Sequence, residues 1–180
     1  YKGYCYRCFI HTFPDHPAIR NHKTKERSVA DYVRNTFQQY DITFDTRLSG
    51  GCSRRRPDIS IDYGSHLIIV EVDENQHQRY DLTCDHRRVM ELFLDGGSRP
   101  LVVIRFNPDD YLDSNNINHP SCWGYTKDKG LCVVKPKKVE EWNHRLETLK
   151  HAIERACEIG GSKEIDVLQL FYDGWEDKKA

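Results

Sequence analysis

Apolar and polar positions alternate along residues 58–73, which predicts two β-strands joined by a tight turn. The turn is Tyr63-Gly64-Ser65-His66, with Gly64-Ser65 at a two-residue tip. One face of this hairpin is expected to lie in the core and carries Ile59, Ile61, Ile68, Val70 and Val72. The opposite face carries Asp58, Ser60, Glu71 and Asp73.

Helical and strand patterns recur through the rest of the chain. Apolar residues three and four positions apart predict helices, at residues 24–40, 83–95 and 138–159. Shorter apolar runs predict strands, at residues 43–48, 101–106 and 165–172. Gly96-Gly97 and Gly160-Gly161 end the second and third helices. The polar, turn-rich residues 107–130 are expected to form a long loop.

The order of these elements predicts an α/β fold, with a mixed central β-sheet flanked by helices. The strand, helix and strand over residues 67–106 imply a right-handed parallel crossover. At 180 residues, the chain is expected to hold one main domain over residues 19–180. Residues 1–18 form a small Cys-containing segment before it.

Charge and hydropathy limit the possible partners. The net charge of −1 gives no overall positive field, so a nucleic acid would be bound by local patches. Basic runs stand at Arg54-Arg55-Arg56 and within residues 135–138. No apolar run approaches the roughly 20 residues that span a membrane, and no signal peptide is visible. We therefore expect an intracellular protein without a membrane partner.

The hairpin register places Asp58 directly opposite Glu71, with Cβ atoms about 5 Å apart. Two such carboxylates repel unless one is protonated or a cation lies between them. Hard divalent ions with oxygen ligands, Mg²⁺ above all, suit this pair. The alternative is a solvated sheet face that happens to carry acids.

The dipeptide Pro57-Asp58 followed by Val70-Glu71-Val72-Asp73 resembles the PD-(D/E)xK restriction-endonuclease-like nucleases. The resemblance covers roughly residues 24–107 and, more loosely, the C-terminal helix. Asp73 occupies the usual Lys position, whereas His77 follows Glu71 by six residues. This departure is similar to the branch of very-short-patch repair and homing endonucleases. Further residues of that pattern are Tyr80, Asp85, Arg88 and Ile104-Arg105-Phe106.

The resemblance implies a Mg²⁺- or Mn²⁺-dependent DNA endonuclease. Asp58 and Glu71 would hold the metal, with the Val72 carbonyl as a third ligand, and His77 would act as general base. A non-catalytic DNA-binding module on a decayed nuclease fold and an RNA-directed nuclease are the alternatives. For His77, the alternatives are a phosphate contact or simple packing.

Other charged residues have two interpretations each. Asp73 binds a second ion or pairs with Arg56. Glu26 is an outer metal ligand or an acid favoured by the dipole of a first helical turn.

Arg88 contacts phosphate or pairs with Asp85. Arg105, in a buried strand, needs an acidic partner. The basic runs are candidate DNA-backbone contacts, at Arg54, Arg55, Arg56, Lys135, Lys137 and Lys138. A merely solvated surface is the alternative for the lysines.

Seven cysteines without a sign of secretion indicate thiols or zinc ligands more than disulfides. Cys5-x-x-Cys8 is half of a zinc site, which His11 and His16 would complete as a structural Zn²⁺ centre. A cysteine pair preceding Tyr1 in a longer chain is the other option. Further candidate ligands are Cys52, Cys84, Cys122 and Cys132. The last two flank residues 123–131 and would staple that loop through zinc.

Overall fold

The computed structural model of the chain describes residues 3, 8–9, 12–13, 16, 23–77, 82–160 and 163–176, without the side chains of His77, Leu82 and Ile159. Its centre is a five-stranded sheet in the order β1-β2-β3-β4-β9. The strands are β1 (Asp41–Phe44), β2 (Ile59–Asp62), β3 (Leu67–Val72), β4 (Leu101–Phe106) and β9 (Ile165–Leu170). The first three are antiparallel, and β3, β4 and β9 are parallel. The predicted mixed sheet is therefore confirmed.

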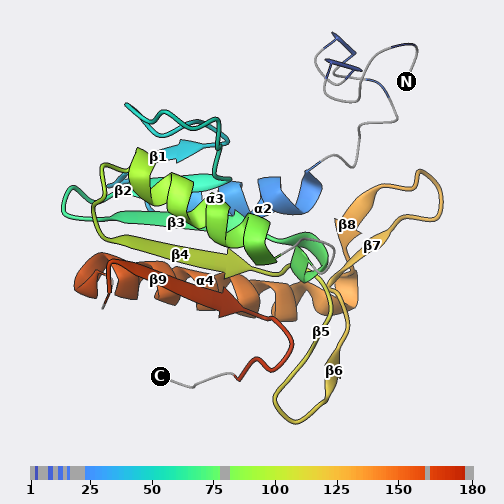
Figure 1. Cartoon of the computed structure of the whole chain (residues 1–180). Coiled ribbons are helices and arrows are strands. Elements are labelled where there is room, and N and C mark those ends of the chain that lie inside the picture. The colour runs from blue at the N-terminus through green and yellow to red at the C-terminus, as the bar shows by residue number, and fades with distance from the viewer. Residues whose placement is uncertain are drawn as a thin grey trace.

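Helices cover both faces of this sheet (Figure 1). They are α2 (Thr24–Thr36), α3 (Leu82–Asp95) and α4 (Val139–Ile159). The larger core joins α2 and α4 to the predicted apolar face of the hairpin, where Ile59, Ile61 and Ile68 are fully buried. A smaller core packs Leu92 of α3 against Leu67 and Ile69 on the other face. All six residues of β3 are buried, because the strand has a neighbour on each side and a helix layer over each face.

The hairpin has the predicted register. Ile59 lies opposite Val70, and the Tyr63 N–H donates to the His66 carbonyl at 3.1 Å. Gly64 adopts a φ of +84° in the turn, a conformation that glycine accepts without steric cost. Continuing this ladder by one residue places Asp58 opposite Glu71, as the sequence predicts.

The first helix and the first strand differ most from the sequence prediction. The first helix ends at Thr36 and not at residue 40, although Phe37 continues the apolar stripe and is 2% exposed. The Thr36 hydroxyl donates to the Tyr32 carbonyl at 2.8 Å, a local bond that competes with regular helix. The next strand is Asp41–Phe44 and not residues 43–48, because Asp45 adopts a φ of +44° and turns the chain out of the sheet.

The prediction of one long loop at residues 107–130 is wrong, because the segment forms short paired strands. It contains β5 (Tyr111–Leu112), which pairs with β6 (Asn118–His119), and β7 (Trp123–Tyr125), which pairs with β8 (Cys132–Val134) just beyond the segment. Both ribbons extend past the ends of β3 and β4 (Figure 1). No helix within the described part of the chain is long and apolar enough to cross a membrane. The division at residue 18 falls largely outside the described residues and stays a prediction.

Candidate functional site

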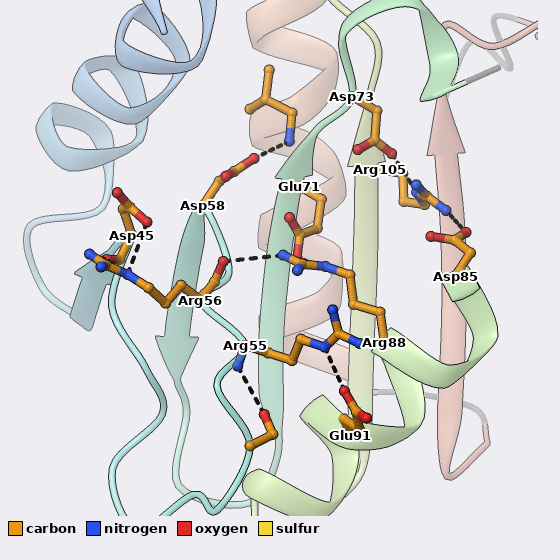
Figure 2. A network of polar contacts seen from close by, with 12 residues as sticks. Asp45, Arg55, Arg56, Asp58, Glu71, Asp73, Asp85, Arg88, Glu91 and Arg105 are labelled. Carbon is orange, nitrogen blue, oxygen red and sulfur yellow. Dashed lines mark hydrogen bonds and ion pairs between the residues drawn. The ribbon is translucent and has the colours of Figure 1, made fainter. Parts of the chain in front are cut away.

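The candidate site lies where β2 begins and β3 ends. Asp58 comes directly after the buried Pro57, which suits the start of a strand because proline has no N–H for the ladder. The Val72 N–H donates to Asp58 Oδ2 at 2.8 Å across the hairpin (Figure 2). This bond holds the Asp58 carboxyl over the end of β3, beside Glu71, which is 8% exposed.

Arg88 extends from α3, which packs over this face of the sheet, to Glu71 (Figure 2). Its Nη2 and Nε lie 2.7 and 3.2 Å from Glu71 Oε1, and Nη2 also donates to the Arg56 carbonyl. Both bonds to Glu71 end on Oε1, so Oε2 takes no part in this ion pair. Arg88 therefore pairs with the candidate metal ligand, and the predicted pair between Arg88 and Asp85 is wrong.

The surroundings disfavour the charged form of both carboxyls. Burial, and then the nearby charge of Glu26, raise the pKa of Asp58 to about 6. Burial also raises the pKa of Glu71 to about 7, with Arg88 opposing the shift and Asp58 adding to it. Near neutral pH the pair therefore binds protons readily, and a cation in their place would be electrostatically favourable.

The N-terminal end of α2 adds two charges to the site. Lys23, at a φ of +53°, precedes the helix, and its Nζ lies 2.8 Å from Glu26 Oε1 and 3.4 Å from Asp45 Oδ2. Glu26 raises the pKa of Asp58 and Lys23 lowers it, so both groups act on that carboxyl. Sequence reasoning found Glu26 but missed Lys23.

Asp73 lies two residues after Glu71, lines a small cavity together with it and is 1% exposed. It forms an ion pair with Arg105 of β4 and accepts a hydrogen bond from the Tyr172 hydroxyl at 2.5 Å. Arg105 also pairs with Asp85 of α3, so its predicted acidic partners are confirmed (Figure 2). The proposed pair between Asp73 and Arg56 is wrong, because Arg56 binds Asp45. Asp73 thus ties β3, β4 and the end of β9 together.

A short 3-10 turn, η2 (Glu74–His77), carries the chain onward from the site. Asn75 and Gln76 both have positive φ, so the turn is tight and depends on outside contacts. The Asn75 N–H donates to Asp109 Oδ2 at 3.1 Å, and the Gln76 amide donates to Asp173 Oδ1 at 2.9 Å. These contacts hold the backbone of His77 near the end of β3, whereas its side chain lies outside the described residues.

Some of the predicted DNA contacts are bonded to other residues of the protein, and others are exposed. Arg54 is exposed, whereas Arg55 pairs with Glu91 of α3 (Figure 2). Lys138 pairs with Glu141. Lys135 donates to the Ser121 carbonyl at 2.9 Å, and Lys137 is exposed.

The predicted zinc ligands are only partly described. Cys5 and His11 lie outside the described residues, while Cys8 is exposed and His16 contacts the Phe9 ring edge-on. Cys52 and Cys84 are exposed at separate places, in the loop before β2 and on α3. Among the residues that the structure describes, no three His, Cys, Asp or Glu side chains are gathered into a ready-made metal site.

The predicted zinc staple between Cys122 and Cys132 is wrong. Cys132 lies opposite Tyr125, and Cys122 continues the ladder opposite Lys135, whose N–H donates to the Cys122 carbonyl at 2.8 Å. Because neighbouring residues alternate across a strand, the two cysteines lie on opposite faces of the ribbon. They cannot bind one ion together in this arrangement.

Comparison with known proteins adds no family assignment to this geometry. The chain matches no protein-family model and no curated protein.

Proposed function

We propose that this chain is a metal-dependent DNA endonuclease, which hydrolyses a phosphodiester bond with a metal-activated water. The observation that carries the proposal is the opposed pair of Asp58 and Glu71. Their carboxyls lie at the end of a buried sheet, have raised pKa values and are next to the charges of Glu26, Lys23 and Arg88. Carboxyls with strongly shifted pKa values that cluster with other charges mark a candidate functional site.

The donor chemistry fits Mg²⁺ or Mn²⁺, both of which prefer oxygen ligands. Asp58 and Glu71 would hold the ion, with the Val72 carbonyl as a further donor and Glu26 as an outer ligand. A bound ion would supply Lewis-acid polarisation of the phosphodiester and stabilisation of the leaving oxygen. The repulsion that raises the pKa of Glu71 near Asp58 is the interaction that such a cation would relieve.

The chain's own residues would divide the remaining work. Arg88 and Lys23 place positive charge on two sides of the acid pair, where they would attract and orient a phosphate group. His77 would accept the proton of the attacking water, because imidazole is the side chain best suited to proton transfer near neutral pH. Asp73 would act only through structure, by fixing the end of β3 to β4 and β9.

The main rival is a DNA-binding module that has lost its chemistry. Burying two like charges side by side destabilises a fold, and nothing in DNA binding alone needs them. A decayed site would be more stable with one acid replaced, so the intact pair favours catalysis. An RNA-directed nuclease is the second rival, because the acid pair does not distinguish the sugar.

Incubation with supercoiled plasmid tests the proposal. The protein should nick or linearise the plasmid with Mg²⁺ or Mn²⁺ and not with EDTA, and Asp58→Asn or Glu71→Gln should each abolish cleavage. Asp62→Asn is the matched control, since Asp62 is on the same strand but pairs with Arg99 at the far end. His77→Ala should slow cleavage by about 10²–10⁴-fold. Full activity in both acid variants would exclude this site, and a gel shift without cleavage in any metal would favour the binding module.

A further inference from the structure

The ribbon formed by β7 and β8, residues 121–135, lies within the most basic part of the chain. Residues 121–138 contain five lysines and a single acidic residue, Asp128, although the whole chain has a net charge of −1. Positive charge is therefore concentrated on this ribbon and on the turn that follows it. A surface of this kind attracts a polyanion from solution.

The base of the ribbon is firmly anchored. Trp123 is 8% exposed and packs edge-on against Trp142 of α4, with ring centroids 5.1 Å apart. Lys135 extends the pairing through its N–H bond to the Cys122 carbonyl. These contacts fix the direction in which the ribbon extends from the core.

The tip of the ribbon is also preformed. The Thr126 N–H donates to the Leu131 carbonyl and the Gly130 N–H donates to the Thr126 carbonyl, both at 2.9 Å. Gly130 has a φ of +60°, which closes the turn without strain. Lys127 and Lys129 lie in this turn and are exposed. Tyr125, at the end of β7 beside the turn, is 71% exposed. An aromatic ring and two lysines are therefore held out in solvent at little further cost in entropy.

A chain of bonds connects the ribbon to η2, the turn that follows β3. The Ser121 hydroxyl donates to Asp109 Oδ1 at 3.1 Å, and Asp109 Oδ2 accepts the Asn75 N–H of η2. Lys25 of α2 bridges Asp109 and Glu74, at 2.6 and 3.3 Å. The ribbon consequently stands at the end of the sheet where β3 ends (Figure 1), and Glu71 is the second-last residue of that strand.

We propose that the β7–β8 ribbon enters the major groove of duplex DNA, with Lys127 and Lys129 on phosphates and Tyr125 against base edges. This inference rests on the proposed function and deepens it, since it names double-stranded DNA as the substrate class. The major groove of B-DNA is about 12 Å wide and about 8.5 Å deep, and it admits a two-stranded ribbon. The stretch from Trp123 to Asp128 spans roughly 17 Å when extended, so a ribbon lying across the groove would bring Tyr125 over the bases and its tip lysines to the phosphates at the groove edge.

Duplex RNA does not fit the same ribbon. Its major groove is deep and too narrow for side chains to read, so docking there would be blocked. Single-stranded nucleic acid has no groove, and a rigid ribbon offers it only scattered contacts. The geometry therefore favours B-form duplex DNA over both.

Fluorescence anisotropy of a short labelled DNA duplex, measured in EDTA, tests this assignment without cleavage. The variant Lys127→Gln/Lys129→Gln should bind at least about tenfold more weakly, and the slope of log K against log[salt] should shrink by about 2. Tyr125→Ala should also weaken binding by about tenfold, the usual size of a lost base-edge contact. The matched control is Lys150→Gln/Lys163→Gln, which removes the same charge from α4 and from the residues before β9 and should change neither affinity nor slope by much. Thermal unfolding of each variant checks that these exposed substitutions leave the fold intact.

Three outcomes would overturn the ribbon assignment. They are no duplex binding by the wild type, ribbon variants that bind like the control, and wild-type affinity for duplex RNA or single strands equal to that for duplex DNA. Hydrolysis of bis-p-nitrophenyl phosphate with Mn²⁺ tests the nuclease proposal independently of the ribbon, because this small substrate has no groove for the ribbon to enter. Ribbon variants should hydrolyse it at the wild-type rate. If the wild type cleaves nothing but its duplex binding still depends on the ribbon, the nuclease proposal falls and the ribbon assignment stands.

Discussion

Asp58 and Glu71 are held in surroundings that oppose their negative charge. Burial is the largest cause for both, and the neighbouring acids add to it. Lys23 and Arg88 offset part of this effect from α2 and α3. The free energy of unfolding should therefore fall as these carboxyls ionise, and a neutral replacement should stabilise the protein. An ordinary salt-bridged acid would show the opposite behaviour.

The stability of the protein should fall as the pH rises through the titration of Asp58. The folded state keeps the Asp58 proton up to about pH 6, whereas an unfolded chain releases it near the ordinary pKa of 3.8. Between these values the folded state binds more protons, so its free energy of unfolding decreases with rising pH. Asp58→Asn cannot ionise and should gain up to about 3 kcal/mol relative to wild type between pH 4 and pH 8.

Urea unfolding in EDTA at a series of pH values measures this difference. Comparing the same two proteins across pH cancels any pH-independent effect of the substitution. A difference in the free energy of unfolding that stays constant over this range would show that Asp58 has an ordinary pKa.

At the scale of elements, the hairpin and the parallel unit were predictable because their sequence signals are local. A two-residue tip and two chemically distinct faces determine the register of residues 58–73. Residues 107–130 gave no such signal, since their strands have only two or three residues, too few for an alternating pattern to show. Their pairing depends on side-chain bonds, such as those from the Asn115 and Ile117 N–H groups to Asp113 Oδ1. Lys23 could not be found from a local pattern either, because its place beside Glu26 and Asp45 depends on how α2 packs on the sheet.

Asp109 should be the most important single residue for holding η2, α2 and the ribbon together. It is 5% exposed and accepts bonds from Lys25, Asn75 and Ser121, while its carbonyl accepts a bond from Arg145. Asp109→Asn removes the charge that Lys25 pairs with and one of the acceptor atoms. We expect a loss of about 2–4 kcal/mol in the free energy of unfolding.

The adjacent Asp110 provides a matched control, because it is exposed. Asp110→Asn should change stability by less than about 0.5 kcal/mol. Equal effects of the two substitutions in chemical denaturation would refute the central place given to Asp109.

At the scale of the whole molecule, a mixed sheet with helices on both faces brings distant residues to one end. Glu26, Asp58, Glu71 and Arg88 come from α2, the start of β2, the end of β3 and α3. The sequence predicted this sheet and the opposed acids, since both follow from pattern and register. It did not predict that Arg88 would bind Glu71 or that Asp73 would turn toward Arg105, because these choices depend on the helix over that face of the sheet.

The central claim is that the opposed acids form a cation site, and calorimetric titration with Mn²⁺ tests it most directly. We expect saturable binding with release of protons, larger at pH 6 than at pH 8, because protons occupy the pair at the lower pH. Asp58→Asn and Glu71→Gln should each abolish or greatly weaken this binding, while Asp62→Asn should bind like wild type. Undiminished binding and proton release in both acid variants would contradict the account.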